Sequence, residues 1–258
     1  MTQDVSRRAF TLAMGSAALG SGLLRAQAQN GKSVLQRPIP HAKGETIPVV
    51  GLGTSEVFEV GSSPSDRAGP TAVVQALISG GGSVIDTAPS YGEAERVVGD
   101  ILAATGLRPR AFIATKLEYY RPGAEESEAR GCLERLHTPK LDLLQLHNVR
   151  DPRQDMTGLN ALKSRGICRY TGITTTFDEA YGAAEAIIKR TRPDFLEIDY
   201  AIDNREAEKR VLPAAADAGT AVLVALPFGR GHLFRSVLGK NCRIGPAKST
   251  ARAGASSS

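Results

Sequence analysis

The sequence contains no tryptophan, and only three of its 258 residues are cysteines. Cys132, Cys168 and Cys242 cannot all pair with one another, and none belongs to a CxxC motif or has metal-ligand spacing. We therefore expect packing residues or free thiols, no disulfide framework and no metal site. Basic and aromatic residues are not interleaved, which disfavours a surface that stacks on nucleic-acid bases.

Clustered positive charge is also missing from the body of the chain. The formal net charge is +5, but residues 1–28 contribute +2 and residues 239–258 contribute +4, which leaves −1 for the residues between them. A phosphate-binding face needs lysine and arginine side chains gathered on one folded surface. We therefore expect no nucleic-acid partner.

An apolar run long enough to span a membrane is likewise missing. The uncharged stretch Ala13–Leu24 is shorter than the roughly 20 residues that a transmembrane helix needs. It lies between Arg7-Arg8 and Ala26-Gln27-Ala28, an order typical of a cleaved secretory signal. We predict that residues 1–28 are a signal peptide and that the chain has no stable membrane span.

This signal resembles the twin-arginine type of bacteria, because Phe10 and Leu12 follow the arginine pair. The resemblance implies export of an already folded protein by the twin-arginine translocation machinery, and a periplasmic location for the mature chain. Residues 29–45, which follow the signal, are expected to be a linker.

Residues 46–238 contain short apolar runs that alternate with longer mixed segments. The predicted strands are Val49–Gly53, Ser83–Asp86, Ala111–Lys116, Leu141–His147, Tyr170–Thr174, Phe195–Tyr200 and Ala221–Leu226. The segments between them carry apolar residues three and four positions apart, as buried helix faces require. Such repetition of one βα unit predicts parallel strands joined by right-handed crossovers.

Two folds have this order of elements, the β/α barrel and the open doubly wound sheet. A doubly wound dinucleotide fold usually carries G-x-G-x-x-G after its first strand, but Gly51-Leu52-Gly53 is followed by Thr54-Ser55-Glu56. We therefore predict an α/β fold of the (β/α)8 TIM-type class. The barrel is expected to be incomplete, because no eighth strand is recognisable and residues 239–258 have the composition of a flexible basic tail.

Polar residues end three consecutive predicted strands: Asp86, Lys116 and His147. Tyr91 lies in the loop after the first of them. Because the active site of a β/α barrel lies at the C-terminal ends of its strands, we expect these four side chains at one mouth. Each alone has an ordinary explanation, such as a helix cap or a solvated lysine, but together they favour a proton-transfer site.

The four residue types suit the reduction of a carbonyl, which needs a hydride on carbon and a proton on oxygen. A phenol with a pKa of about 10 is a weak acid unless a nearby cation lowers that pKa, and Lys116 can be the cation. Asp86 would hold Lys116 charged, and His147 would orient the carbonyl oxygen. Tyr91 is then the candidate proton donor.

These residues lie in motifs that resemble the aldo-keto reductase family from about Thr46 to Phe234. The motifs are Gly82-Ser83-Val84-Ile85-Asp86-Thr87-Ala88, Tyr91-Gly92, Ala114-Thr115-Lys116 and Leu141-Asp142-Leu143-Leu144-Gln145-Leu146-His147. The resemblance implies an oxidoreductase that uses NADP, with NAD possible, to reduce an aldehyde or ketone of small size to an alcohol. It also implies Tyr91 as general acid, Lys116 and Asp86 as the pair that tunes it, and His147 as the residue that orients the carbonyl.

The positions that match the family's nicotinamide contacts are altered in this chain. Thr174 and Thr175 carry hydroxyls that can bond a carboxamide, whereas Glu197 brings a charge and Ala225 offers no stacking ring.

The loop Pro227–Gly231 resembles the family's pyrophosphate loop and makes Phe228, Gly229 and Arg230 candidate cofactor contacts, although its glycines equally suit an ordinary turn. The family's eighth strand and the adjoining segment that binds the adenosine 2′-phosphate have no counterpart. The chain therefore resembles a C-terminally truncated member.

Two other hypotheses remain open. In the first, the chain is a truncated, non-catalytic relative with impaired cofactor binding. In the second, it is a barrel lyase or isomerase in which Lys116 acts as a Schiff-base amine. The second is disfavoured because Asp86 and Tyr91 suit a charged lysine.

Overall fold

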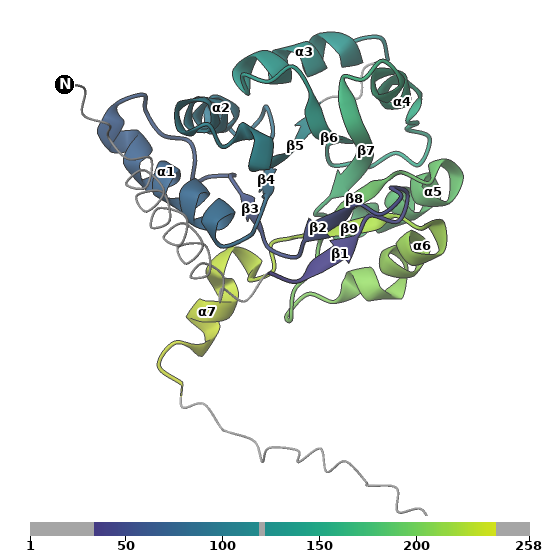
Figure 1. Ribbon diagram of the computed structural model, residues 1–258. Coiled ribbons are helices and arrows are strands. Elements are labelled where there is room, and N and C mark those ends of the chain that lie inside the picture. Colours follow the sequence, from purple (N-terminus) through teal and green to yellow (C-terminus); the bar gives the residue numbers. More distant parts are fainter. Residues whose placement is uncertain (1–33, 119–121, 241–258) are drawn as a thin grey trace, which may run out of the picture.

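The computed structural model describes residues 34–118 and 122–240 (Figure 1). The predicted signal peptide, residues 1–28, lies outside these ranges, as does most of the predicted tail. None of the helices within the described ranges is both long enough and apolar enough to cross a membrane.

Seven parallel strands form one sheet that curves into a nearly closed barrel, as the sequence predicted (Figure 1). In order they are β3 (Gly51–Gly53), β4 (Val84–Asp86), β5 (Phe112–Leu117), β6 (Leu141–Leu146), β7 (Cys168–Thr175), β8 (Phe195–Asp199) and β9 (Ala221–Ala225). Each strand pairs with the next one along the chain. No eighth strand joins β9 to β3 in the described part of the chain, so one side of the barrel is open.

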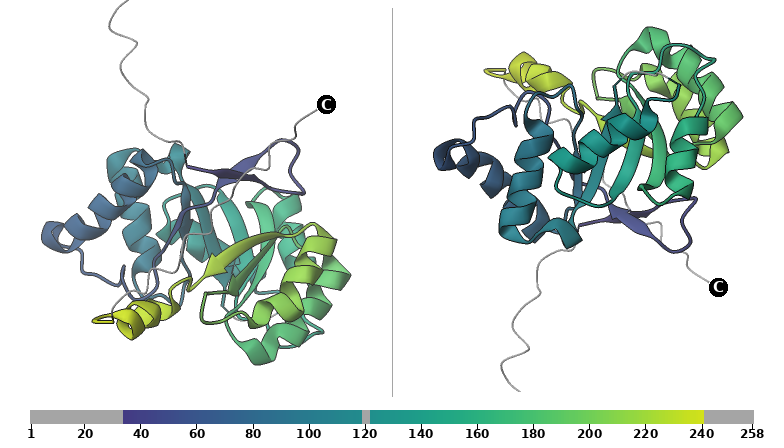
Figure 2. Two further views of the ribbon diagram at one scale, coloured as in Figure 1. Left: turned by 90° about the horizontal axis from the view of Figure 1, so that it is seen from below. Right: turned by 90° about the horizontal axis from the view of Figure 1, so that it is seen from above.

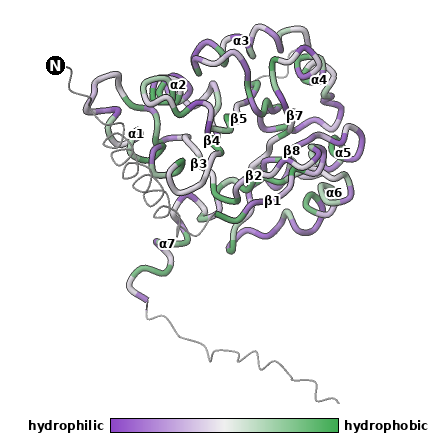
Figure 3. The backbone as a smooth tube through the Cα atoms, in the orientation of Figure 1, coloured by the Kyte–Doolittle hydropathy of each residue, from purple (hydrophilic) through white to green (hydrophobic). Residues whose placement is uncertain are grey.

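Helices lie around the outside of the sheet (Figure 1). The α-helices are α1 (Pro64–Ser79), α2 (Ala94–Thr105), α3 (Glu125–Arg135), α4 (Thr157–Ser164), α5 (Tyr181–Thr191), α6 (Val211–Ala218) and α7 (His232–Val237). Short 3-10 helices cover Arg108–Arg110, Asp178–Ala180, Glu206–Lys209 and Gly229–Gly231. Hydrophobic residues gather along the strands and the inner sides of the helices, as Figure 3 shows, and this layer forms the larger core.

Helix α2 shows how the sequence positions one such layer. It buries Val97, Val98, Ile101 and Leu102, which recur three and four residues apart and so share one face. Gly99 adds close contact with the next helix, because a Cβ at this position would lie 2.5 Å from the carbonyl oxygen of Arg135.

The N-terminal half of the barrel interior is filled by aromatic rings. Phe112, Tyr170 and Phe195 lie with ring centroids 5.5 to 6.1 Å apart. Side chains alternate between the two faces of a strand, so Ala114 and Lys116 follow Phe112 on the inner face of β5. Lys116 therefore lies beyond the aromatic rings, close to the end of the barrel where the strands finish.

Residues 36–48 form a hairpin of strands β1 (Gln36–Pro38) and β2 (Thr46–Pro48), which pair antiparallel. Much of the segment 29–45 that was expected to be a linker is therefore ordered structure. It is held in place because Ile39 and Ile47 are buried against the aromatic layer. The hairpin and α7 lie at opposite ends of the barrel (Figure 2).

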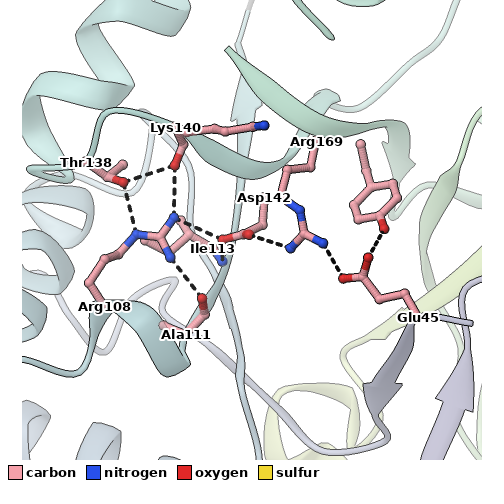
Figure 4. Close-up of polar contacts among 9 residues, drawn as sticks. Glu45, Arg108, Ala111, Ile113, Thr138, Lys140, Asp142 and Arg169 are labelled. Carbon is pink, nitrogen blue, oxygen red and sulfur yellow. Dashed lines mark hydrogen bonds and ion pairs between the residues drawn. The ribbon is translucent and has the colours of Figure 1, made fainter. Parts of the chain in front are cut away.

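A polar network also anchors the hairpin (Figure 4). Glu45 accepts hydrogen bonds from Arg169 and from the hydroxyl of Tyr170. Arg169 also donates to Asp142 at 2.9 Å, and Asp142 accepts a second guanidinium hydrogen bond, of 3.1 Å, from Arg108. The network ties the hairpin to β6 and β7 at the end of the barrel away from the predicted site.

Candidate active site

The structure brings all four predicted site residues together at the C-terminal ends of β4, β5 and β6. Lys116 Nζ lies 2.6 Å from Asp86 Oδ1 and 5.2 Å from the centre of the Tyr91 ring. The rings of Tyr91 and His147 are 6.0 Å apart and meet nearly edge to face, at 78°. Parallel register explains the grouping, because it places consecutive strand ends side by side.

Lys116 is fully buried and is surrounded by oxygen atoms. Besides Asp86, its ammonium group contacts the carbonyl oxygen of Thr87 at 3.1 Å and Glu197 Oε2 at 3.3 Å. Burial alone would lower the pKa of Lys116, but the charges of Asp86 and Glu197 outweigh burial and raise it. The amine is therefore charged, which disfavours the Schiff-base hypothesis.

Glu197, predicted as a cofactor contact, lies inside the barrel beside Lys116. Gln145, which was not predicted, donates a hydrogen bond of 2.8 Å to Glu197 Oε2. Burial would raise the pKa of Glu197, but Lys116 and Gln145 lower it. The pKa of Asp86 is instead raised to about 8, by burial and by the charge of Glu197, against the attraction of Lys116.

The pKa of Tyr91 differs from the expectation that Lys116 lowers it. Lys116 does act in that direction, but burial acts more strongly in the other, and Asp86 and Glu197 add to it. The net effect raises the pKa of Tyr91 to about 12. Tyr91 is consequently protonated at neutral pH, which is the state that a proton donor needs.

His147 has a partner that the sequence did not reveal. Its Nδ1 lies 2.9 Å from Glu118 Oε2, and the backbone N–H of Ser90 donates to Glu118 Oε1 at 3.0 Å. Burial would raise the pKa of Glu118, but these two hydrogen bonds lower it to about 2. An ionised carboxylate only accepts, so His147 Nδ1 donates to it. Glu118 directly follows the last residue of β5, and this position at a strand end is the signal that could have identified it.

Thr174 and Thr175 lie at the end of β7, next to the loop after β6. Thr174 Oγ1 accepts a hydrogen bond of 2.9 Å from the backbone N–H of Asn148, and Thr175 Oγ1 accepts one of 3.3 Å from Phe177. Asn148 Oδ1 is buried, and no donor reaches it within the part of the chain that the structure describes. Asn148, next to Thr174, thus has an unpaired buried acceptor that can receive a hydrogen bond from the N–H2 group of a carboxamide.

The other predicted cofactor contacts, Phe228, Gly229 and Arg230, follow β9 and are engaged elsewhere. The ring of Phe228 packs on Phe234 with centroids 4.9 Å apart, and Arg230 Nη1 lies 2.6 Å from Glu56 Oε1. Gly229 has a φ of 53° in a tight turn. None of the contacts found within the described ranges joins these three residues to Lys116 or Tyr91.

No group of three or more His, Cys, Asp or Glu side chains within residues 34–118 and 122–240 is arranged to hold a metal ion. The chemistry that the arrangement supports is proton transfer from Tyr91, with His147 beside it.

Known proteins are similar to this chain in sequence. The chain is 36% identical over 116 residues to methylglyoxal reductase YeaE of Escherichia coli, a match that covers 43% of this chain and 39% of that protein. It is 27% identical over 195 residues to aldo-keto reductase str7 of Strobilurus tenacellus, which covers 70% of this chain and 56% of that protein. The chain thus spans about 40% to 60% of the length of these curated relatives.

Two solved structures resemble the fold. An aldo/keto reductase from Klebsiella pneumoniae in complex with NADP and acetate superposes with a TM-score of 0.62 at 25% identity, covering 75% of this chain and 69% of that chain. Glycerol dehydrogenase AKR11B4 from Gluconobacter oxydans superposes with a TM-score of 0.64 at 26% identity, covering 82% of this chain and 68% of that chain. Residues 49–249 match the aldo/keto reductase family itself, so the chain belongs to that family.

Proposed function

We propose that this chain is an NADP-dependent oxidoreductase that reduces an aldehyde or ketone to an alcohol. The observation that carries the proposal is the contact of Tyr91 with Lys116, whose Nζ lies 2.6 Å from Asp86 and 5.2 Å from the Tyr91 ring centre. It is supported by the similarity to a methylglyoxal reductase and to a structure in complex with NADP.

In the proposed reaction, the Tyr91 hydroxyl gives its proton to the carbonyl oxygen. The charged Lys116 stabilises the phenolate that remains, and Asp86 holds the ammonium group in place. His147 donates a hydrogen bond from Nε2 to the same oxygen while Nδ1 is held by Glu118. Bound NADPH would supply the hydride, with Thr174, Thr175 and Asn148 holding its carboxamide.

The test is NADPH oxidation by the purified chain with a small aldehyde. Because a positioned acid contributes about 10²- to 10⁴-fold, Tyr91→Phe is expected to lower kcat by at least about 100-fold. Tyr170→Phe is the matched control, since the Tyr170 hydroxyl bonds Glu45 at the opposite end of the barrel. Equal activity of the Tyr91→Phe variant and the wild type would show that Tyr91 is not the acid.

A second candidate is a non-catalytic relative with impaired cofactor binding. It is favoured by the pairing of Arg230 with Glu56, which engages a side chain predicted to contact cofactor. Titration of the chain with NADPH, followed by nucleotide fluorescence and calorimetry, separates the two candidates. Micromolar binding contradicts the non-catalytic candidate, and absence of binding contradicts the reductase.

Export of the chain to the periplasm is a further part of the proposal, supported by the pattern of Arg7, Arg8, Phe10 and Leu12. A fusion of residues 1–28 to a reporter that is active only after export tests it in bacteria. Replacing both Arg7 and Arg8 with lysine is expected to abolish the activity of the reporter, and unchanged export would contradict a twin-arginine route.

A further inference from the structure

Two carboxyl groups, from Asp86 on β4 and Glu197 on β8, converge on one ammonium group inside the barrel. Asp86 Oδ1 lies 2.6 Å and Glu197 Oε2 lies 3.3 Å from Lys116 Nζ. Only 19% of the Asp86 side chain and 9% of the Glu197 side chain are exposed. Because both oxygen atoms contact the same nitrogen atom, the two carboxyl groups lie close to each other.

Their closeness to each other and to a single cation sets a condition on their protonation. Two ionised carboxylates can only accept hydrogen bonds, so a bond between them requires one proton. If both carboxyl groups were ionised, Asp86, Glu197 and Lys116 would together carry a net charge of −1, and burial penalises a net charge. One proton shared by the two carboxyl groups makes the three side chains neutral together.

The neighbouring elements do not supply another positive charge to this pair in the described part of the chain. The loop after β4 presents the Tyr91 phenol, and β6 presents the neutral amide of Gln145. His147, after β6, faces Tyr91, and its Nδ1 is bonded to the carboxylate of Glu118 at the end of β5. Lys116 is thus the cation that the pair shares.

We propose that Asp86 and Glu197 share one proton in the folded protein, and that Glu197 is a positioning residue that keeps the Tyr91 hydroxyl protonated. The raised pKa of Asp86, about 8, and the lowered pKa of Glu197 agree with a proton that resides on the Asp86 side at neutral pH. Glu197 lies 3.3 Å from the Lys116 ammonium group, which is 5.2 Å from the centre of the Tyr91 ring, so its negative charge adds to burial in disfavouring the phenolate of Tyr91.

The consequence for the reaction rests on the proposed function. A tyrosine that stays protonated can give a proton to a carbonyl oxygen, but it is poorly suited to remove a proton from an alcohol. Glu197 therefore favours carbonyl reduction over alcohol oxidation at neutral pH. In a Glu197→Gln variant, oxidation of the alcohol is expected to begin at a lower pH than in the wild type.

The first experiment looks for the shared proton in the wild-type chain by infrared spectroscopy. A protonated buried carboxyl group gives a carbonyl stretching band that is separate from the carboxylate bands. We expect this band at about pH 6.5, and we expect it to disappear as the pH rises through about 8, where Asp86 ionises. It should be absent from Asp86→Asn, and its absence from the wild type would overturn the shared proton.

The second experiment measures the ionisation of Tyr91 by ultraviolet absorbance, with the Tyr91→Phe spectrum subtracted. Removing a neighbouring negative charge in Glu197→Gln is expected to lower the pKa of Tyr91 by about one pH unit or more. Glu185→Gln is the matched control, because Glu185 pairs with Lys189 and Arg210 on the outside of the barrel. In Glu197→Asp, which keeps the negative charge, the pKa of Tyr91 should stay higher than in Glu197→Gln.

An unchanged pKa of Tyr91 in a folded Glu197→Gln variant would overturn the positioning role. Neither spectroscopic measurement needs cofactor or turnover, so each can succeed when NADPH-dependent activity is absent. Loss of the infrared band together with normal activity would instead contradict the inference and leave the proposed reductase intact.

Discussion

The Glu118 carboxylate is the feature with the clearest consequence at the scale of single residues. It fixes the proton on Nδ1 of His147, and it ties the ring to the loop that carries Tyr91 through the N–H of Ser90. Because Nδ1 is a donor, Nε2 can donate to a substrate oxygen only when the ring is an imidazolium. The proposed role of His147 therefore depends on a partner carboxylate.

Replacing that carboxylate with an amide, in Glu118→Gln, should weaken the reaction. A hydrogen bond to a charged group is worth about 1.5 to 3 kcal/mol, which corresponds to a fall in kcat of roughly 10- to 100-fold. Steady-state kinetics with a small aldehyde between about pH 5 and 9 would measure this, with the exposed Glu126→Gln as control. If the kcat of Glu118→Gln equalled that of the wild type across this pH range, Glu118 would not act on His147.

The sequence predicts the members of the site but not their electrostatic balance. Asp86, Lys116 and His147 were identifiable because each ends an apolar run, and chain order alone places consecutive strand ends together. The pKa of Tyr91 was predicted with the wrong net sign, because burial raises it more than Lys116 lowers it, and further negative charge comes from Asp86 and from Glu197. That residue reaches the site from across the barrel, and only the three-dimensional structure shows its contact with Lys116.

Close packing of α2 on α3 depends on a glycine, at the scale of secondary-structure elements. A Cβ on Gly99 would lie 2.5 Å from Arg135 O and 2.9 Å from the Cα of Leu136, and backbone atoms cannot move as a side chain does. Gly182, in α5, is a helical glycine whose Cβ would meet only the guanidinium group of Arg210, at an ordinary contact distance of 3.7 Å.

The two helical glycines make a matched pair of substitutions. Gly99→Ala is expected to lower the free energy of unfolding by about 1 to 3 kcal/mol, since overpacking outweighs the better helix propensity of alanine. Gly182→Ala should raise it by about 0.5 to 1 kcal/mol, because only the propensity changes. Urea denaturation followed by circular dichroism measures both, and equal effects would contradict the close contact of α2 with α3.

The hairpin of β1 and β2 is the element that sequence patterns did not reveal. Its strands have three residues each and no alternation of apolar and polar residues, so period-two reasoning has nothing to detect. Its stability comes from elsewhere in the chain, through the burial of Ile39 in the barrel and the bonds of Glu45 to Arg169 and Tyr170. Contacts so distant in sequence are not visible in local composition.

The folding stability of the whole molecule should depend on pH in two separate windows. The pKa of Glu118 is lowered in the folded state, so its contribution is present above about pH 4.5 and is lost as the pH falls towards about 2. The pKa of Asp86 is raised, so the folded state binds more protons than the unfolded state between about pH 4 and 8, and stability falls as the pH rises through that window.

Urea denaturation of the wild type, Glu118→Gln and Asp86→Asn at about pH 3, 6 and 8.5 tests this expectation. Glu118→Gln should lessen the loss of stability between about pH 6 and 3, and Asp86→Asn should lessen the loss between about pH 6 and 8.5. Identical pH dependence in all three proteins would show that neither carboxyl group is perturbed as described.

Within residues 34–118 and 122–240, no strand pairing joins β9 to β3, but a charged pair joins the loops that follow them. At the mouth, the loops after β3 and β9 are joined by Arg230 and Glu56, whose side chains are 56% and 70% exposed. Dissolved ions screen such an exposed pair, with a Debye length of about 8 Å at physiological ionic strength and about 3 Å at 1 M. Concentrated salt is therefore expected to weaken the link between these two loops.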